Sequence, residues 1–203
     1  MSSNGTVVAI GAIKKDTANC AESGHVRVYE RNAGTTTWEQ KGADIDGEAA
    51  NDWSGLSVSL SRSDGTVVAI EAYLNDGVNG AADSGHVPVY AWDGTNWNQL
   101  GTDIDGEAAD DRSGSYVSLS DDGTVLAIGG IYNDGINGVD SGHVRVYAWD
   151  GTNWNQHGTD IDGEALDDRS GWSVSLSSDG TILAIGVYLN DGVHGADSGH
   201  VRV

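Results

Sequence analysis

The sequence is poor in several residue types that most proteins use freely. Phenylalanine is absent, and proline, cysteine and methionine each occur only once among the 203 residues. The one cysteine, Cys20, therefore cannot form an internal disulfide. No run approaches the roughly 18 apolar residues that a membrane helix requires, and no signal peptide precedes the first expected strand. The sequence thus predicts no membrane insertion.

Basic residues are scarce as well. Ten lysines and arginines face 31 aspartates and glutamates, which leaves a net charge of −21. A surface this acidic repels phosphate backbones and anionic lipid headgroups, so nucleic acid is excluded as a partner. The same charge suits a protein that binds a divalent cation, and equally one whose solvated acidic surface keeps it in solution.

Glycine, by contrast, is abundant, with 30 residues. Many glycines follow an aspartate between two short apolar runs, as at Asp64-Gly65, Asp122-Gly123 and Asp179-Gly180. Such pairs supply the positive φ angles of two-residue hairpin turns. Because no segment shows a helical period, this pattern predicts an all-β protein.

The sequence repeats itself. The tetrapeptide SGHV begins at residues 23, 84, 141 and 198, so successive copies are 61, 57 and 57 residues apart. A second landmark, DIDGEA, begins at residues 44, 103 and 160. A period of this length exceeds that of helical solenoids and is typical of one blade of a β-propeller.

Each full period contains four segments with strand character. In the second copy the first segment, 56–60, alternates apolar residues with serines, and the second, 66–70, is apolar throughout. The third alternates again, with Val87 and Val89 facing one way, and the fourth spans 97–104. An apolar second strand should be covered on both faces. Four strands joined in sequence order predict an antiparallel meander of blade size.

These segments predict a partial β-propeller of four-stranded antiparallel meander blades. The expected units are residues 1–53, which lack a first strand, 54–112, 113–169, and 170–203, which lack a last strand. Because neither end completes its blade, we expect the chain to be a fragment whose partners are the remaining blades of a longer propeller. Homo-oligomerisation is the alternative.

A meander also separates its connections onto two faces. The tight Asp-Gly turns after the first and third strands lie on one face, and the longer loops lie on the other. In the third copy those longer loops, DGINGVD and DIDGEALDD, carry most of the acidic residues. The sequence therefore predicts a negative face opposite the tight turns.

The repeat resembles a known family. SG-x-SVSLS, then DGT-x-x-AIG, then SGHVRVY is similar to the FG-GAP repeat of integrin alpha-subunit β-propellers and their microbial relatives, over the whole chain in three and a half copies. The Phe-Gly position is filled by Ser54-Gly55, Ser113-Gly114 and Ser170-Gly171. The Gly-Ala-Pro position is filled by Gly11-Ala12, Glu71-Ala72, Gly129-Gly130 and Gly186-Val187.

The resemblance implies an extracellular or cell-surface propeller used for adhesion or ligand binding, with a protein or glycan as partner. It also implies a calcium loop between the first two strands. Only the tight turn SDG stands there in the second copy, at residues 63–65. That turn is too short to wrap a cation that takes six to eight oxygen ligands.

The best metal candidates lie instead in the DIDGEA loops, where three carboxylates stand at positions i, i+2 and i+4. Hard cations such as calcium favour oxygen clusters of this kind. Carboxylates beside glycine also form Asx turns that satisfy backbone donors without any ion, and this alternative stays open. The candidate ligands are Asp44, Asp46, Glu48, Asp103, Asp105, Glu107, Asp160, Asp162 and Glu164.

Histidines recur at the start of the third strand, at positions 25, 86, 143 and 200. One histidine per blade leaves them far from each other, so we expect structural hydrogen bonds rather than a shared metal. Trp38, Trp97 and Trp154 are expected to pack between blades. Trp92 and Trp149 stand beside a turn, where exposed rings would stack on sugars.

Catalytic motifs are missing from this sequence. No nucleophile and base recur together, and a repeated set of carboxylates does not single out one active site. We therefore expect no enzyme but a binding or adhesion module with an acidic, calcium-binding loop face. A structural spacer domain of a larger surface protein and a lectin-like, glycan-binding propeller are the alternatives.

Overall fold

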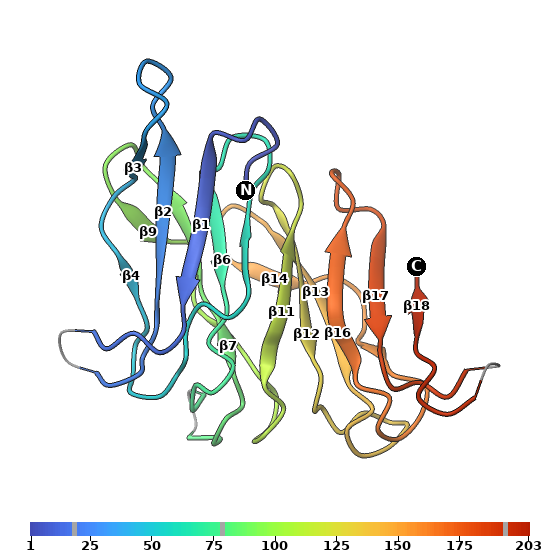
Figure 1. Cartoon of the computed structure of the whole chain (residues 1–203). Coiled ribbons are helices and arrows are strands. Elements are labelled where there is room, and N and C mark those ends of the chain that lie inside the picture. Colours follow the sequence, from blue (N-terminus) through green and yellow to red (C-terminus); the bar gives the residue numbers. More distant parts are fainter. Residues whose placement is uncertain (18–19, 78–79, 193–194) are drawn as a thin grey trace.

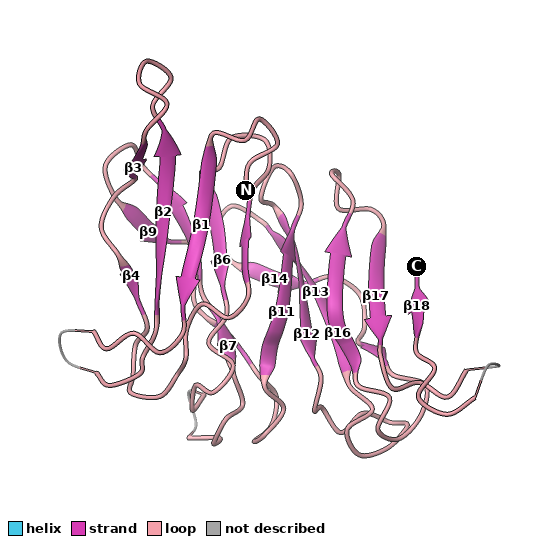
Figure 2. Cartoon of the chain, viewed as in Figure 1, coloured by secondary structure: helices cyan, strands magenta, loops and turns pink. Residues whose placement is uncertain are grey.

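The structure is a computed structural model that describes residues 1–17, 20–77, 80–192 and 195–203. These residues form strands, turns and loops, and no helix (Figure 2). None of the described segments is therefore a helix long and apolar enough to cross a membrane. The prediction of an all-β fold is confirmed.

The strands fall into four blades in chain order. Blade 1 contains β1 (Val7–Ala12), β2 (His25–Arg31), β3 (Trp38–Gln40) and β4 (Ile45–Asp46). Blade 2 contains β5 (Val58–Leu60), β6 (Val67–Ile70), β7 (His86–Val87), β8 (Val89–Trp92), β9 (Trp97–Gln99) and β10 (Ile104–Asp105). Blade 3 contains β11 (Ser113–Leu119), β12 (Val125–Gly130), β13 (His143–Trp149), β14 (Trp154–Gln156) and β15 (Ile161–Asp162). Blade 4 contains β16 (Ser170–Leu176), β17 (Leu183–Val187) and β18 (His200–Arg202).

Each blade is an antiparallel meander, as the repeat predicted. In blade 3 the order is β11-β12-β13-β14, and β15 pairs with the other half of β13. The expected single fourth strand, 97–104 in blade 2, is therefore interrupted and forms β9 and β10. Gly101 lies in the interruption with φ at 74°, a left-handed conformation that an extended strand does not contain.

The blades stand side by side as a partial β-propeller, with blades 1 and 4 at opposite ends (Figure 1). The β16–β17 turn and the β2–β3 loop lie at the upper edge, and the β1–β2 and β17–β18 loops lie at the lower edge (Figure 1). We call "lower face" the edge formed by the loops between the second and third strands of each blade and by the loops joining one blade to the next. The expected separation of tight turns from long loops is thus present.

The hydrophobic core lies between neighbouring blades. Side chains of blades 1 and 2, of blades 2 and 3, and of blades 3 and 4 form three successive clusters. The second strands of the middle blades are covered on both faces, as their sequence predicted: in β12, Leu126 and Ile128 on one face are 0% and 1% exposed, and Ala127 on the other face is 0% exposed. In the outer blades Ile10 and Ile182 are 52% and 57% exposed. Each outer blade has a described neighbour on only one side (Figure 1).

Blade 2 departs from the regular pattern at Pro88. Ile70 donates its N–H to the Pro88 carbonyl at 3.1 Å, but proline has no N–H to complete the pair. The third strand therefore divides into β7 and β8, and the blade splits into two sheets. In blade 3 the same position is Arg145, which pairs with Ile128 within the continuous strand β13.

Candidate functional site

Three groups of metal-capable side chains lie among the described residues, and each contains a histidine. In every group the ligand atoms lie within 4.8 Å of one another. The histidine begins the third strand of a blade, and at least one aspartate comes from the DIDGEA segment of the same blade. The first group is His25, Asp44 and Asp46; the second is Glu48, His86 and Asp103; the third is Glu107, His143 and Asp160.

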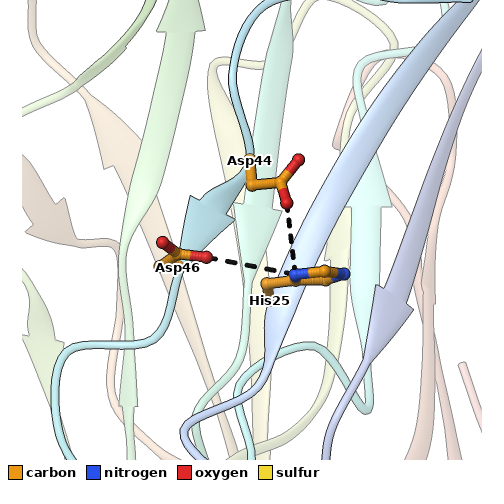
Figure 3. Close-up of side chains that lie close together, drawn as sticks. All are labelled: His25, Asp44 and Asp46. Atoms are coloured by element: carbon orange, nitrogen blue, oxygen red, sulfur yellow. Dashed lines mark ion pairs between the residues drawn. The ribbon is translucent and has the colours of Figure 1, made fainter. Parts of the chain in front are cut away.

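The first group is balanced by an arginine. His25 Nδ1 lies 3.5 Å from Asp44 Oδ2 and 3.9 Å from Asp46 Oδ1 (Figure 3). Arg27 donates two hydrogen bonds to the Asp44 carboxylate, at 2.9 and 2.8 Å. This guanidinium, together with the hydrogen bond from Gln40, holds the pKa of Asp44 at about 2. The carboxylate is therefore ionised and already paired.

The third group also contains an arginine, and it spans two blades. His143 Nδ1 lies 3.9 Å from both Glu107 of blade 2 and Asp160 of blade 3. Arg145 Nη1 lies 3.7 Å from Glu107, and Arg145 is only 5% exposed. Burial and the neighbouring Arg145 lower the pKa of His143 to about 4, so the imidazole is neutral at pH 7.

In blade 4, the histidine and arginine of β18 lie beside a glutamate in the same way. His200 Nε2 lies 3.8 Å from Glu164, which follows β15 in blade 3. Arg202 Nε lies 3.9 Å from the same glutamate and donates a hydrogen bond from Nη1 to the Asp162 carbonyl at 2.7 Å. Histidine, arginine and a glutamate from the preceding blade therefore form a recurring unit.

The second group lacks the arginine. His86 is 3% exposed, and Glu48 of blade 1 is exposed at the rim of the group. Gln99 donates a hydrogen bond to Asp103 Oδ1 at 2.7 Å. Burial raises the pKa of Glu48, and the nearby Asp103 carboxylate raises it further. This is a cluster of like charges around a buried imidazole.

The sequence-predicted ligands are thus distributed over neighbouring groups. Within one DIDGEA loop the first aspartate stays with the histidine of its own blade, and the glutamate reaches the histidine of the next blade. The middle aspartates, Asp46, Asp105 and Asp162, lie opposite His25, His86 and His143 in the strand ladders. The histidines, expected to serve structure alone, are the element that joins these acids. Their offset from DIDGEA, 19 residues in the first blade and 17 in the next two, is the sequence signal that could have indicated this pairing.

Other acids of the same loops, which are not among the candidate ligands, accept hydrogen bonds from the backbone. Asp111 is 4% exposed, and its Oδ2 accepts hydrogen bonds from the Ala108 N–H at 3.0 Å and from Asn133 at 3.1 Å. Asp52 and Asp168 make the equivalent bonds in the neighbouring loops. These acids close the turns that carry Glu48, Glu107 and Glu164.

Two small cavities on the lower face adjoin these turns. One, of about 290 Å³, is lined by the residues directly after Glu48 together with Leu74, Asn75, Asp76 and Asp83. The other, of about 300 Å³, is lined by the residues directly after Glu107 together with Tyr132 and Asp140. Volumes near 300 Å³ are at the lower end of those that hold small ligands.

The tryptophans divide into two classes. Trp97 and Trp154 pack between blades as expected, and their indole N–H groups donate to the carbonyls of Lys41 and Leu100 in the preceding blades, at 2.7 and 3.2 Å. Trp38 is 46% exposed. Trp92 is half-buried and packs against Trp97, with ring centroids 5.4 Å apart.

No family model and no curated protein matches the sequence. By fold, the chain is similar to the crystal structure of a Bacteroides uniformis protein provisionally named 6-phosphogluconolactonase. The TM-score is 0.55 and the sequence identity 14%, over 87% of this chain and 43% of that one. The chain therefore spans less than half the length of that protein, and a likeness at this identity concerns the fold.

This comparison corrects the prediction of a non-enzymatic binding or adhesion module. A chain with the same blade arrangement bears the name of an enzyme, so this architecture is no argument against catalysis. The prediction rested on the view that a repeated set of carboxylates leaves nothing singular. The blades are not identical, however, because blade 2 has Glu71 where blades 1, 3 and 4 have glycine, and Pro88 where they have arginine.

Proposed function

We propose that the chain is part of a β-propeller hydrolase that opens a sugar lactone with a divalent cation bound on the lower face. The observation that carries this proposal is the set of histidine–carboxylate groups beside cavities of about 290 and 300 Å³. The name of the similar Bacteroides protein supplies the substrate class.

The chemistry requires water to add to the lactone carbonyl. A divalent cation held by these side chains would supply the Lewis acidity that lowers the pKa of a water molecule to near 7, so that hydroxide would be available at neutral pH. Hydroxide forms a bond to the carbonyl carbon, the ring C–O bond breaks, and the released ring oxygen takes up a proton. The product is the open-chain hydroxy acid. The imidazole nitrogens and carboxylate oxygens of the groups are suitable cation ligands.

The charge of the molecule favours a neutral substrate. With a net charge of −21, the protein repels a phosphorylated lactone at long range. The cavity beside Glu48 is lined by acids, amides and apolar side chains, with no lysine or arginine among them. Such a lining accepts hydrogen bonds from sugar hydroxyls and offers no partner to a phosphate.

We also infer that the blades are FG-GAP-type repeats. The glycines at the second position of the motif, Gly55, Gly114 and Gly171, have φ angles of 101°, 94° and 93°. A Cβ at Gly11 or Gly129 would collide with the carbonyl of Gly55 or Gly171 in the next blade. Glycine is therefore required by backbone conformation at the first of these positions and by the close approach of the next blade at Gly11 and Gly129, whereas blade 2 has Glu71 there. Calcium, an extracellular location and further blades as partners stay predictions.

Hydrolysis of glucono-1,5-lactone tests the proposed function. We expect the protein to accelerate ring opening above the buffer rate, to lose activity in EDTA and to recover it with added divalent cation. The 6-phosphorylated lactone should react more slowly, and the difference should shrink at high salt because screening weakens the repulsion. Rates equal to buffer alone for both lactones, with cation present, would refute the proposal.

A further inference from the structure

Position 88 sets the second group apart from the other three blades. Arg27, Arg145 and Arg202 follow the histidine by two residues, and their guanidinium nitrogens lie 2.8, 3.7 and 3.9 Å from a carboxylate of their group. Pro88 stands in that place in blade 2. Within the described part of the chain, neither Glu48 nor Asp103 forms an ion pair with a lysine or arginine. The negative charge of this group is therefore not neutralised.

His86 lacks the partners that its counterparts have. Its ring makes no hydrogen bond or ion pair with the residues that the structure describes, although the side chain is 97% buried. His25, His143 and His200 each lie between 3.5 and 3.9 Å from a carboxylate. One nitrogen of this buried imidazole lies within 4.8 Å of two carboxylate oxygens, those of Glu48 and Asp103. The arrangement lacks a positive charge at its centre.

The donor set indicates the class of cation. One imidazole nitrogen and two carboxylate oxygens suit first-row transition metals such as zinc, whereas calcium takes oxygen ligands alone. Ligands of one zinc ion, bound at about 2.0–2.2 Å, lie at most about 4.4 Å apart. Atoms within 4.8 Å therefore need only a small movement, and exposed Glu48 has the freedom to make it.

The surroundings also match a catalytic rather than a structural zinc site. Three protein ligands leave one coordination position for water, as catalytic zinc sites do. The exposed side of the group faces solvent at Glu48, and the cavity of about 290 Å³ begins at Ala49. Gln99 donates a hydrogen bond to Asp103 Oδ1, which is the kind of second contact that fixes a metal-ligating carboxylate.

We propose that Glu48, His86 and Asp103 bind one transition-metal dication, and that replacement of the repeat's arginine by Pro88 creates this site. The first and third groups, and the corresponding unit of blade 4, are occupied by their own arginines and bind no such metal. The assignment deepens the proposed function by naming its centre. Only the reaction assigned to this centre rests on the proposed function. The metal binding itself is inferred from the residues of the site.

Zinc titration by calorimetry tests the assignment on the full chain after EDTA treatment. We expect one tight site per chain in the wild type. Glu48→Gln removes a ligand at an exposed position and should weaken this binding by about 100-fold. Pro88→Arg restores the guanidinium of the other blades, together with the missing strand N–H, and should weaken binding as strongly without loss of folding. Glu107→Gln changes the equivalent glutamate of the third group and should leave binding unchanged.

The outcomes separate this assignment from the proposed hydrolase. Equal loss of zinc in Glu48→Gln and Glu107→Gln, or unchanged binding in Glu48→Gln and Pro88→Arg, would overturn the site. Zinc binding without lactone hydrolysis would refute the function and leave the site standing. Hydrolysis that persists in zinc-free Glu48→Gln would refute the site as the centre and leave the function standing.

Discussion

Blades 2 and 3 share one repeat and differ in how regularly they form it. Blade 3 is a single five-stranded sheet, whereas blade 2 divides into a four-stranded and a two-stranded sheet. Its first strand, β5, has three residues, and the corresponding β11 has seven. Two substitutions accompany this difference, Glu71 in place of Gly129 and Pro88 in place of Arg145. The irregular blade is also the one with the uncompensated metal-capable group.

The two substitutions act on one strand pair. Pro88 lies opposite Ile70, and Glu71 follows directly. Glu71 is fully buried, and its carboxylate accepts hydrogen bonds from the N–H groups of Ser57 at 2.7 Å and Tyr73 at 2.9 Å. A side chain thus satisfies backbone groups beside the shortened strand. Both departures from the repeat thus lie in the blade that holds the proposed metal site.

The largest effect on stability is expected from Glu71→Gln. Burial raises the pKa of Glu71 from 4.5 to about 8, so the folded protein holds a proton that the unfolded chain releases. This contribution is fully present below pH 4.5 and is lost as the pH rises to 8. The wild type should therefore lose roughly 4–5 kcal/mol over this interval, and Glu71→Gln should not. Urea unfolding at pH 5, 7 and 9 measures the difference.

The two stability curves should cross. At pH 5 the glutamine is less stable than the protonated acid, because its NH₂ group faces one of the two backbone donors and leaves it unpaired. At pH 9 the order reverses, because only the wild type then buries a charge. Parallel curves over the whole pH range would show that Glu71 does not titrate between 4.5 and 8.

A smaller effect on stability should follow from Arg145→Ala, which removes the guanidinium from the third group. Arg145 donates to the Asp105 carbonyl at 2.8 Å and to Ser113 Oγ at 3.0 Å, so its loss in EDTA should cost roughly 3 kcal/mol. The third group (His143, Glu107 and Asp160) then has no guanidinium beside it, as is already the case in the second group. We expect a second zinc site per chain and partial recovery of stability by zinc. Calorimetric stoichiometry and urea unfolding with and without zinc measure both.

The matched control is Arg145→Ala combined with Glu107→Gln. This double variant should be destabilised as well, but it should bind only one zinc because a ligand of the third group is gone. If Arg145→Ala itself bound only one zinc, the arginine would not be what keeps metal out of the regular blades. The replacement of arginine by Pro88 would then not explain the site in blade 2.

The fold was predictable because its signals are local and recur. Alternating residues such as 56–60, the apolar run 66–70 and the Asp-Gly turns fix strands and hairpins by the conformations they allow. The broken fourth strand was missed because Gly101 is one glycine among many. Nothing in its sequence neighbourhood distinguishes a left-handed residue inside a strand from a turn at its end.

The site was only partly predictable. The acids of the DIDGEA loops were identified, but spacing along the chain treats Asp44, Asp46 and Glu48 as one cluster. The structure divides them, since Glu48 lies with His86 of the next blade. Contacts between blades depend on how repeats stack, which the period alone does not define. Pro88 gains its meaning from the contact between Arg145 and Glu107 in the next blade, which the sequence alone does not show.

The smallest effect concerns the serines that join the first strands of neighbouring blades. Between blades 2 and 3, Ser59 Oγ accepts the Leu119 N–H at 2.9 Å; between blades 3 and 4, Ser118 Oγ accepts the Leu176 N–H at 3.0 Å. Leu119 is 3% exposed and Leu176 is half-buried, so water replaces the lost acceptor only at Leu176. Ser59→Ala should therefore cost about 1–2 kcal/mol and Ser118→Ala about half as much, by urea unfolding. Equal losses would mean that water reaches the two interfaces to the same extent.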